Sequence, residues 1–363
     1  MADKPVGLVN TMALISVCIP AYNRAGVLPA LLDSILNQDF DNFDIVIAED
    51  FSPERKAIAA KVAEYQHRFG VKVKYRENPQ TLGYDGNLRR LVELATGEYV
   101  LFMGNDDLLA PGALRAVAMA VREREDVGVV LRSYVSFLKN PERPEQIFRY
   151  FSEDRIFPPG PDTVVTFFRR CVFISGMVFR RSSAAACATS QFDGTLLYQQ
   201  HLVGNILARE SGVYLSRILS HHRLGGVPDF GASASEKGRF VPRHQTPESS
   251  LHFMRGMLAI AYSLDVAGES QVGRRILRDI GNYAYPILSI QAGQPFRSFL
   301  SYVWRLMKLG FWRVPLFHVY ALGLLVLGRR NCDALIRVIK QKLGRAPVVG
   351  NVYAGKARAV SSE

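Results

Sequence analysis

Two adjacent carboxylates, Asp106 and Asp107, follow directly after an apolar run from Tyr99 to Met103. Such a run predicts a buried strand, which would present both carboxylates at its carboxyl end. Neighbouring carboxylates repel each other, and a protein that places them together usually holds a cation between them. Mg²⁺ and Mn²⁺ prefer such oxygen ligands and commonly bind with substrate phosphates. The alternative is a solvated turn in which one carboxylate caps a helix that begins near Pro111.

Two earlier apolar runs also end in polar residues. Residues 14–19 lead into the sequence Pro-Ala-Tyr-Asn-Arg at 20–24, and residues 43–48 lead into Glu49 and Asp50. One polar cluster at a strand end is ordinary. Three clusters on neighbouring strands indicate a binding site, because ligands of parallel sheets bind outside the carboxyl ends of the strands.

The elements that would position these clusters alternate between strand and helix. Strands are predicted at 14–19, 43–48, 71–75 and 99–103, and helices at 27–37, 53–69 and 83–95. This order predicts an α/β fold with a mostly parallel sheet and helices on both faces. Neither a G-x-G-x-x-G nor a G-x-x-x-x-G-K-[ST] motif occurs. Phosphate binding would therefore depend on a metal rather than on a glycine-rich loop.

The motifs resemble those of the family 2 glycosyltransferases with a GT-A fold. The resemblance rests on residues 15–24 (Ile-Ser-Val-Cys-Ile-Pro-Ala-Tyr-Asn-Arg), 47–50 (Ile-Ala-Glu-Asp) and 97–107 (Gly-Glu-Tyr-Val-Leu-Phe-Met-Gly-Asn-Asp-Asp). Residues 82–87 (Leu-Gly-Tyr-Asp-Gly-Asn) are closer to the abequosyltransferase-like branch. The similarity covers roughly residues 12–225. It implies a Rossmann-like GT-A sheet followed by a C-terminal helical region.

The resemblance also implies roles for individual residues. Tyr22 would lie beside the base or ribose of a nucleotide, and Asp50 would accept hydrogen bonds from one of them. Asp107 would ligate Mn²⁺ or Mg²⁺ directly, and the metal would neutralise the departing diphosphate. The implied donor-binding residues are Pro20, Ala21, Tyr22, Arg24, Glu49, Asp50, Asp85, Asn87, Asn105 and Asp106, and the implied metal ligands are Asp107 and Asp106. Asn105 is an amide where an acid is common, but two carboxylates remain.

The catalytic base is the larger departure from the family pattern. Inverting members usually carry an acidic pair on a helix near residue 200, where a carboxylate removes a proton from the attacking hydroxyl. The corresponding residues 192–201 (Phe-Asp-Gly-Thr-Leu-Leu-Tyr-Gln-Gln-His) contain no such pair. Asp193 and His201 are the candidate catalytic residues, although an Asp before a glycine is also typical of a turn. A base elsewhere, such as Asp229, or no base at all stays open, and so does the stereochemistry.

Two further features follow a short strand predicted at 212–219. His221 and His222 are adjacent, and adjacent strand residues point to opposite faces, so at most one would face the diphosphate. Residues 224–235 are rich in glycine and serine. They could form a loop that folds over the donor, or an ordinary linker.

The composition is that of a globular chain in a reducing compartment. The 363 residues are 48% hydrophobic, which is enough for one large core or two moderate ones. Four scattered cysteines, Cys18, Cys171, Cys187 and Cys332, show neither metal-ligand spacing nor a disulfide pattern. The first ten residues lack the features of a signal peptide. We expect a cytoplasmic protein, peripheral on the inner face of the cell membrane.

The membrane expectation comes from residues 290–345. They hold ten Lys or Arg residues and one acid, interleaved with aromatic side chains, which places +9 of the net charge of +12 in this segment. Basic, Trp-containing amphipathic segments bind anionic membrane surfaces. The alternative is a helical subdomain packed on itself or in a dimer, so a homo-oligomer stays open. No nucleic-acid motif accompanies the basic segment, and we expect no nucleic-acid partner.

The predicted organisation has four parts: a GT-A nucleotide-sugar-binding catalytic domain (1–225), a flexible loop or linker (226–249), a basic amphipathic helical region (250–345) and a disordered tail (346–363). We predict a metal-assisted glycosyltransferase of EC class 2.4, inverting by default. It would move a sugar from a nucleoside diphosphate-sugar to a glycan hydroxyl. The implied acceptor is a lipid-linked oligosaccharide of bacterial surface polysaccharide or lipopolysaccharide synthesis.

Two rival functions remain. A nucleotidyltransferase would use similar metal and nucleotide geometry, but it would normally show a basic glycine-rich phosphate loop near the N-terminus, which residues 20–24 are not. A non-catalytic partner protein could keep the GT-A-like fold and bind another transferase through its C-terminal helices. The missing acidic pair near residue 200 is the main support for the second rival.

Overall fold

The computed structural model describes residues 13–226, 229–240, 246–265 and 271–342. Its centre is one ten-stranded sheet in the order β3-β2-β1-β4-β9-β6-β10-β5, with β7 paired to β6 and β8 paired to β10. The strands are β1 (Ile15–Ala21), β2 (Phe43–Glu49), β3 (Val73–Glu77), β4 (Tyr99–Phe102), β5 (Leu108–Leu109), β6 (Val127–Phe137), β7 (Gln146–Phe148), β8 (Arg155–Phe157), β9 (Met177–Arg180) and β10 (Ser211–Arg223).

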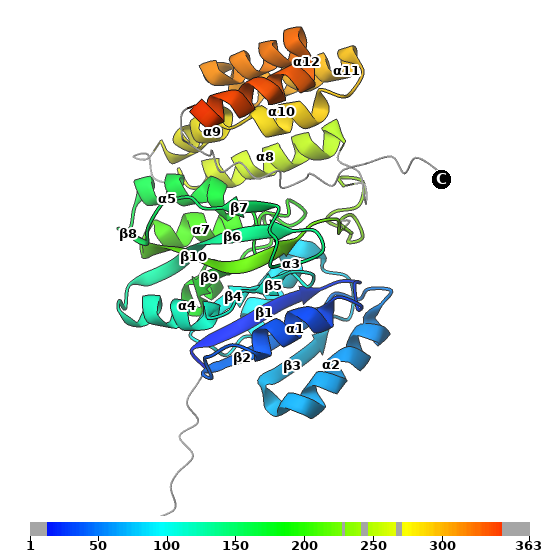
Figure 1. Ribbon diagram of the computed structural model, residues 1–363, viewed down its shortest axis with the longest axis vertical. Helices are drawn as coiled ribbons and strands as arrows, with labels where there is room; N and C mark the ends of the chain where they lie inside the picture. Colours follow the sequence, from blue (N-terminus) through cyan, green and yellow to red (C-terminus); the bar gives the residue numbers. More distant parts are fainter. Residues whose placement is uncertain (1–12, 227–228, 241–245, 266–270, 343–363) are drawn as a thin grey trace, which may run out of the picture.

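Helices cover both faces of this sheet and continue beyond it. They are α1 (Leu28–Leu36), α2 (Arg55–Phe69), α3 (Gly83–Leu94), α4 (Ala113–Arg122), α5 (Pro161–Phe168), α6 (Arg181–Ala186), α7 (Tyr198–Leu207), α8 (Pro247–Ser263), α9 (Val272–Asn282), α10 (Tyr285–Gln291), α11 (Phe296–Lys308) and α12 (Pro315–Lys342). Figure 1 places the N-terminal strands and α1–α2 at one end of the molecule and α8–α12 at the other.

The first half of the sheet confirms the predicted alternation of strands and helices. β1 pairs in parallel with β2 and β4, and β2 pairs in parallel with β3. β2 and β4 are buried along their whole length, as expected for parallel strands covered on both faces. The strand predicted at 71–75 begins at Val73, because residues 70–72 form a single 3₁₀ turn.

The second half of the sheet is mixed. β9 runs antiparallel to both β4 and β6, whereas β6 and β10 pair in parallel. The parallel strands β1, β2 and β4 therefore deliver their carboxyl ends to one edge, and β10 brings its own carboxyl end beside β5, which follows Asp107. This arrangement brings residues more than 100 positions apart to the edge that was predicted to hold the site.

Two hydrophobic layers lie on the two faces of the sheet. On β1, the side chains of Val17 and Ile19 belong to the layer that includes α1, α2 and α4, and Cys18 between them belongs to the opposite layer. This is the alternation that a period of two produces. The opposite layer continues without a break from α3, α5 and α7 into α8–α12. The C-terminal helices therefore share a core with the sheet, and the division at residue 225 stays a prediction.

Several sequence predictions concern residues beside or outside the part of the chain that the structure describes. The helical region predicted over residues 250–345 begins with α8 at Pro247, after a capping box in which Thr246 and Ser249 bond each other's backbone. Residues 241–245 and the tail 346–363 lie outside the described residues. Within the described chain, no helix combines the length and apolar character needed to cross a bilayer. α12 is broken at Gly328, whose φ is 72°.

Candidate functional site

Strained backbone marks the carboxyl edge of the sheet. Among the described residues, the non-glycine positions with left-handed φ are Asn23 (54°), Arg24 (65°), Phe51 (56°) and Leu196 (64°). Each costs about 1–2 kcal/mol relative to a right-handed conformation. The first three follow β1 or β2 directly, beside the polar clusters that the sequence singled out. Strain of this kind persists where surrounding contacts offset its cost, and such positions cluster at functional sites.

Asp50 closes the start of α3 onto the end of β2. Its carboxylate accepts hydrogen bonds from the backbone N–H groups of Leu82 and Gly83, each at 2.8 Å, and from Asn78 Nδ2 at 2.9 Å. Burial raises the pKa of Asp50, and these three donors oppose that rise. Asn87 supports the same corner, because its Nδ2 donates to Ala48 O and its Oδ1 accepts from Asn78.

Unpartnered polar atoms lie beside Asp50. Glu49 is fully buried, and its Oε1 accepts a hydrogen bond from the Ser52 N–H at 2.9 Å. Within the described part of the chain, Glu49 Oε2, Ser52 Oγ and Asn23 Oδ1 are buried without a hydrogen-bond partner. Buried polar atoms are almost always bonded in folded proteins. A polar ligand at this edge, such as the hydroxyl and amide groups of a nucleoside, would supply the missing partners.

The end of β1 forms the floor of the same corner. Pro20 and Ala21 are the last two residues of β1 and pair with Ala48 and Glu49 of β2. The phenol of Tyr22 follows them. Burial raises its pKa first, and the nearby carboxylates Asp229, Asp50, Glu236 and Glu49 raise it further. Carboxylates from the sheet and from residues 229–240 therefore converge on Tyr22.

Asp106 is paired with Arg24 across the gap between β1 and β4. Arg24 Nη1 lies 2.5 Å from Asp106 Oδ2. Burial and the neighbouring charge of Asp107 raise the pKa of Asp106, while Arg24 opposes the rise. Asn105 bridges the same two segments, because its Nδ2 donates to Asn23 O at 3.1 Å.

Asp107 is almost completely buried, with 2% of its surface exposed. Its Oδ1 accepts a hydrogen bond from the Arg223 N–H at 2.9 Å and lies 3.0 Å from His222 Nδ1. Its Oδ2 accepts from Ser175 Oγ. The helix after this turn begins at Ala113 and has no side-chain cap. The alternative in which Asp107 caps that helix therefore does not describe this arrangement.

The two adjacent histidines of β10 are placed differently. Burial lowers the pKa of His222, but its hydrogen bond to Asp107 and the charges of Asp107 and Asp106 outweigh burial, so the pKa is raised overall. The ring of His221 packs edge-on against Phe137, and burial lowers its pKa. His222 is thus the histidine that meets the carboxylates, as expected for neighbours on a strand.

A divalent cation fits the chemistry of this cluster, provided that the substrate completes the site. Among the described residues, no three His, Cys, Asp or Glu side chains are arranged to hold a metal by themselves. Mg²⁺ and Mn²⁺ usually bind one or two carboxylates and take further oxygens from substrate phosphates and water. Asp107 and Asp106 offer such carboxylates, and the imidazole of His222 is within reach of the same oxygen of Asp107.

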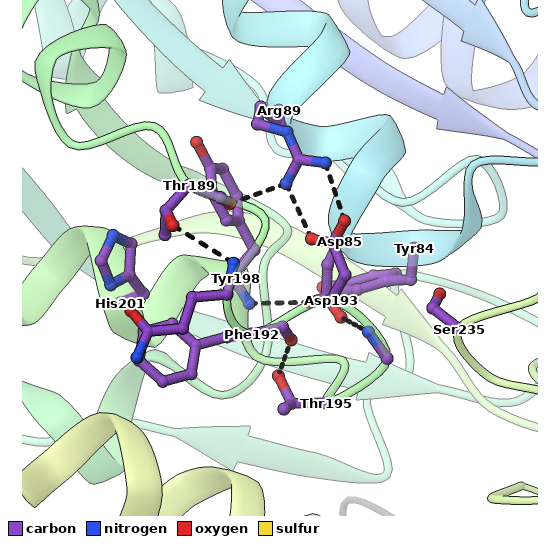
Figure 2. A network of polar contacts seen from close by, with 12 residues as sticks. Tyr84, Asp85, Arg89, Thr189, Phe192, Asp193, Thr195, Tyr198, His201 and Ser235 are labelled. Atoms are coloured by element: carbon purple, nitrogen blue, oxygen red, sulfur yellow. Dashed lines mark hydrogen bonds and ion pairs between the residues drawn. The ribbon is translucent and has the colours of Figure 1, made fainter. Parts of the chain in front are cut away.

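The two candidate catalytic residues belong to one network of polar contacts, which Figure 2 shows. Both carboxylate oxygens of Asp193 are bonded by Arg89, at 2.7 and 2.8 Å. His201 lies within α7, 8% exposed, with Nε2 2.7 Å from Cys187 O and Nδ1 3.2 Å from Asn205 Nδ2. Burial lowers the pKa of His201. Asp193 would have to release Arg89 before it accepted a proton, and the nitrogens of His201 are both engaged by the scaffold.

Asp85 faces the same network rather than Asp50. Its carboxylate accepts from the backbone N–H groups of Gly194, Leu196 and Tyr198, each at 2.9 Å, as part of the contacts in Figure 2. Burial raises the pKa of Asp85 to about 7, although the N–H donors oppose the rise. The assignment of Asp85 to the nucleotide site stays a prediction, and the structure gives its carboxylate three partners in another segment.

Comparisons with known proteins agree with this geometry. The family model described as glycosyl transferase family 2 matches residues 16–184, which contain every polar cluster at the strand ends described above except those on β10 and the 193–198 segment. Over residues 16–184, the chain is similar to glycosyltransferase family 2.

Curated relatives match part of this chain. Abequosyltransferase RfbV of Salmonella typhimurium is 30% identical over 174 residues, which are 47% of this chain and 51% of that protein. The GalNAc(5)-diNAcBac-PP-undecaprenol beta-1,3-glucosyltransferase of Campylobacter jejuni is 30% identical over 115 residues, 31% of this chain and 36% of that protein. The chain therefore spans about half the length, or less, of these relatives.

A solved structure matches over more of the chain. The crystal structure of S. aureus TarS 1–349 in complex with UDP-GlcNAc has a TM-score of 0.59 and 16% identity, and the match covers 91% of this chain and 92% of that one. The complex of the same TarS fragment with UDP has a TM-score of 0.55 and 15% identity. At this level of identity the likeness shows a shared fold, and it confirms the predicted fold class.

Residues 229–240 of this chain cross the carboxyl edge. The carboxylate of Glu236 is 3% exposed and accepts from the Tyr84 N–H at 2.7 Å and the Gly231 N–H at 2.8 Å. Phe230 packs edge-on against Tyr84, with ring centroids 5.7 Å apart. Asp229 Oδ2 lies 3.4 Å from Asn23 Nδ2. This segment lies in the stretch that the sequence predicted to be a loop over the donor or a linker.

Sequence reasoning missed two residues of the site. Ser175 holds Asp107 by its hydroxyl and also accepts the Gly104 N–H at 2.9 Å. Glu236 secures the segment over α3. Ser175 and Glu236 occur in no motif, and their partners lie 68 and 152 residues away. Either residue could be identified only by knowing which segments meet at this edge, and the sequence alone does not show that.

Proposed function

We propose that this protein transfers a sugar from a nucleoside diphosphate-sugar to a hydroxyl of a glycan. The observation that carries the proposal is the pairing of two half-sites at one sheet edge. One half holds the unpartnered oxygens of Glu49, Ser52 and Asn23, which suit a nucleoside. The other holds Asp106 and Asp107 amid cationic side chains, which suits a diphosphate with its metal.

The second half-site would stabilise the departing diphosphate. A bound Mg²⁺ or Mn²⁺ would neutralise charge that develops on the leaving oxygens. Asp107 and Asp106 would hold the ion, and Ser175 and the Arg223 N–H would fix the orientation of Asp107. Arg24 and His222 are positioned to meet phosphate oxygens when their carboxylate partners turn to the metal. Donors preorganised in this way commonly supply the largest part of catalysis.

For proton removal we propose Asp193, with Asp229 as the alternative. Asp193 begins the segment that lies against α3, and it would accept a proton after releasing Arg89, which bonds both of its oxygens. Asp229 lies beside Tyr22 and Asn23 on the other side of the edge. Substitution of each by Asn distinguishes them, because removing the base lowers kcat by about 10²- to 10⁴-fold while donor affinity persists.

We further propose a lipid-linked acceptor of bacterial surface polysaccharide synthesis. The names of two relatives support it, since one is an abequosyltransferase and the other acts on an undecaprenol-linked glycan. Such an acceptor stays in the membrane, so the enzyme must work at its surface. An inverting displacement is the default expectation for the family.

The exposed face of α11 and α12 supports a membrane location. Phe296, Leu300 and Trp304 recur every four residues along α11 and are 66%, 39% and 57% exposed. Trp312 before α12 is 55% exposed, and Val319, Leu322 and Val326 of α12 are 62%, 62% and 71% exposed. A helix that is apolar on both its packed and its open face needs a second apolar partner.

Charge favours a bilayer over a second copy of the chain as that partner. Residues 280–332 contain six Lys or Arg residues and no acid. A symmetric dimer would bring this basic face against itself, and like charges would repel. An anionic lipid surface attracts it, at about 1 kcal/mol per basic residue near the surface. We propose peripheral binding through residues 290–345.

Flotation with lipid vesicles tests the membrane proposal. The protein should bind vesicles that contain phosphatidylglycerol, bind phosphatidylcholine vesicles much less, and dissociate at high salt. Trp304→Ser with Trp312→Ser should weaken binding, whereas Met119→Ser, a 58% exposed residue on α4, should not. Concentration-dependent dimerisation through the same tryptophans, without lipid binding, would show that the apolar face binds a second copy of the chain rather than a bilayer.

Calorimetry of donor binding tests the transferase proposal. UDP-, dTDP-, GDP- and CDP-sugars are titrated with and without Mn²⁺ into the wild type, Asp107→Asn and Asp41→Asn. Asp41 is a fully exposed carboxylate and serves as the matched control. Metal-dependent binding of one donor class, lost in Asp107→Asn and kept in Asp41→Asn, supports the proposal.

The remaining outcomes of this titration separate the rivals. Binding of nucleoside triphosphates in preference to diphosphate-sugars would favour a nucleotidyltransferase. Donor binding without hydrolysis or transfer would favour a non-catalytic partner protein. A folded wild type that binds no donor would overturn the proposed function.

A further inference from the structure

Asp85 is a buried carboxylate outside the diphosphate half-site, and all of its hydrogen-bond donors come from one distant segment. It is 1% exposed and accepts from three backbone N–H groups, those of Gly194, Leu196 and Tyr198, each at 2.9 Å. The three donors come from alternate residues of one short loop, 193–198, more than 100 positions away in the sequence. A single side chain thus fixes the backbone of that loop at three points.

The loop needs such a support because its backbone is strained. Leu196 has a φ of 64°, a left-handed conformation that costs a leucine about 1–2 kcal/mol. Gly194 has a φ of 83°, and a Cβ at that position would collide with Ser235 O. The sequence alone does not favour this conformation of the loop, so contacts from outside must select it.

α3 supplies a second support one helical turn further on. Arg89 follows Asp85 by four residues and therefore lies on the same face of the helix. Its guanidinium bonds both oxygens of Asp193 and also donates to Thr189 O at 2.7 Å. Figure 2 shows Asp85 and Arg89 in the same network of contacts with Asp193 and Tyr198. The hydrogen bond from Arg89 to Asp193 raises the pKa of Arg89.

Contacts of neighbouring segments link the loop to both proposed half-sites. The first turn of α3, which holds Asp85, also donates the Leu82 and Gly83 N–H groups to Asp50. On the other side, Gln199 after the loop donates to Val172 O at 2.7 Å. The turn that follows Val172 contains Ser175, the partner of Asp107. The loop is therefore tied to the nucleoside corner through α3 and to the diphosphate corner through residues 172–175.

We propose that Asp85 is a positioning residue for the acceptor side of the site. By holding loop 193–198 in its strained form, it sets the place where the acceptor hydroxyl meets the sugar and keeps Asp193 at that place. The proposal rests on the proposed transferase function. It differs from a nucleotide-binding role, because the carboxylate is directed at the loop and Asp50 holds the nucleoside corner.

The test compares Asp85→Asn and Asp85→Ala with Asp44→Asn. Asp44 is also a buried carboxylate with three polar donors, Ser16, Lys74 and Thr96, but it lies at the amino end of β2. It therefore controls for the general loss of a buried acid. Three quantities are measured: amide hydrogen exchange of residues 193–198, donor affinity by calorimetry, and the steady-state kinetics of transfer and donor hydrolysis.

We expect exchange in the loop to accelerate at least about tenfold in both Asp85 variants, as hydrogen bonds to a charged acceptor are lost. Donor affinity and donor hydrolysis should stay within about threefold of wild type, while kcat/KM for the acceptor falls at least about tenfold. Asp44→Asn should change none of these beyond its effect on stability. If Asp85→Ala fails to fold, Asp85→Asn, which keeps the size of the side chain, supplies the result.

Two outcomes would overturn the proposal. Unchanged loop exchange in a folded Asp85 variant would show that the carboxylate does not hold the loop. Loss of donor affinity with unchanged acceptor kinetics would place Asp85 in the nucleotide site. A wild type that binds no donor would end the proposed function, and loop exchange would then still decide whether Asp85 holds the loop.

Discussion

His222 Nδ1 lies 3.0 Å from Asp107 Oδ1, although 115 residues separate the two in the sequence. The contact joins the end of β10 to the end of β4, two strands that are not neighbours in the sheet. It places an imidazole and a buried carboxylate where a diphosphate would leave. Asp107 would offer an oxygen ligand to a divalent cation at this point, and His222 would orient that carboxylate and meet the phosphate oxygens.

His222→Ala should weaken Mn²⁺-dependent donor binding by about 10- to 100-fold, because it removes the partner that orients Asp107 for the metal. His221→Ala is the matched control, since its ring packs against Phe137. Calorimetric titration of donor with and without Mn²⁺ measures the effect. Equal losses in the two variants would mean that the histidines matter for the fold of β10 rather than for the metal.

Phe51 offers a test of the strained backbone. Its φ of 56° suits glycine, and 45% of its surface is exposed. Glycine normally destabilises an ordered position relative to alanine, but here alanine keeps the left-handed strain and glycine does not. Phe51→Gly should therefore be more stable than Phe51→Ala by about 1 kcal/mol in urea unfolding. The usual order, with alanine more stable, would show that the backbone relaxes without cost.

The parallel half of the sheet could be predicted because its signals are local. The apolar runs at β1, β2 and β4 are long enough to be recognised as buried strands. The polar residues at their ends indicate the edge where ligands bind. The predicted start of β3 was two residues too early, because residues 70–72 continue the alternating pattern but form a 3₁₀ turn. The polar clusters around Asp50 and Asp107 follow from the same local signals.

The rest of the site depends on contacts that no local pattern contains. Ser175 reaches Asp107 because β9 runs antiparallel beside β4. The hydrophobic pattern of a strand does not predict whether it pairs in parallel or antiparallel. The family resemblance implies a nucleotide role for Asp85, which stays a prediction, and the partners of its carboxylate lie in loop 193–198. Pairings across 100 residues become visible when the topology is known.

The stability contributed by Asp85 should fall as the pH rises. Burial raises its pKa from 3.8 to about 7, so the folded state binds a proton more tightly than the unfolded state. The contribution is fully present below the unfolded pKa near 4 and is lost as the pH rises through 7, by up to a few kcal/mol. The difference in unfolding free energy between wild type and Asp85→Asn, measured by urea at pH 5 to 9, isolates this group.

Relative to wild type, the unfolding free energy of Asp85→Asn should therefore increase between pH 5 and pH 8, because asparagine does not titrate. Asp193 and Glu236 also raise the pKa of Asp85, after burial. A pH-independent difference would show that the N–H donors of the loop keep the carboxylate ionised throughout the range. In that case the three hydrogen bonds, rather than burial, would determine the charge of Asp85.

Ser175→Ala should destabilise the protein more than Ser220→Ala, although both serines are fully buried. Ser175 Oγ accepts the Gly104 N–H and donates to Asp107, so its loss leaves a buried donor unpaired at about 1–3 kcal/mol. Ser220 Oγ donates to Ser175 O, an oxygen that also accepts from Arg132 Nε and stays partnered. Urea unfolding of the two variants measures the difference.

The same pair separates stability from function. Ser175→Ala should also weaken metal-dependent donor binding, because Asp107 Oδ2 loses the hydroxyl that fixes its orientation. Ser220→Ala leaves every partner of Asp107 in place and should bind donor as the wild type does. Equal donor affinities in the two variants would show that the Arg223 N–H and His222 hold Asp107 without help from the 173–176 turn.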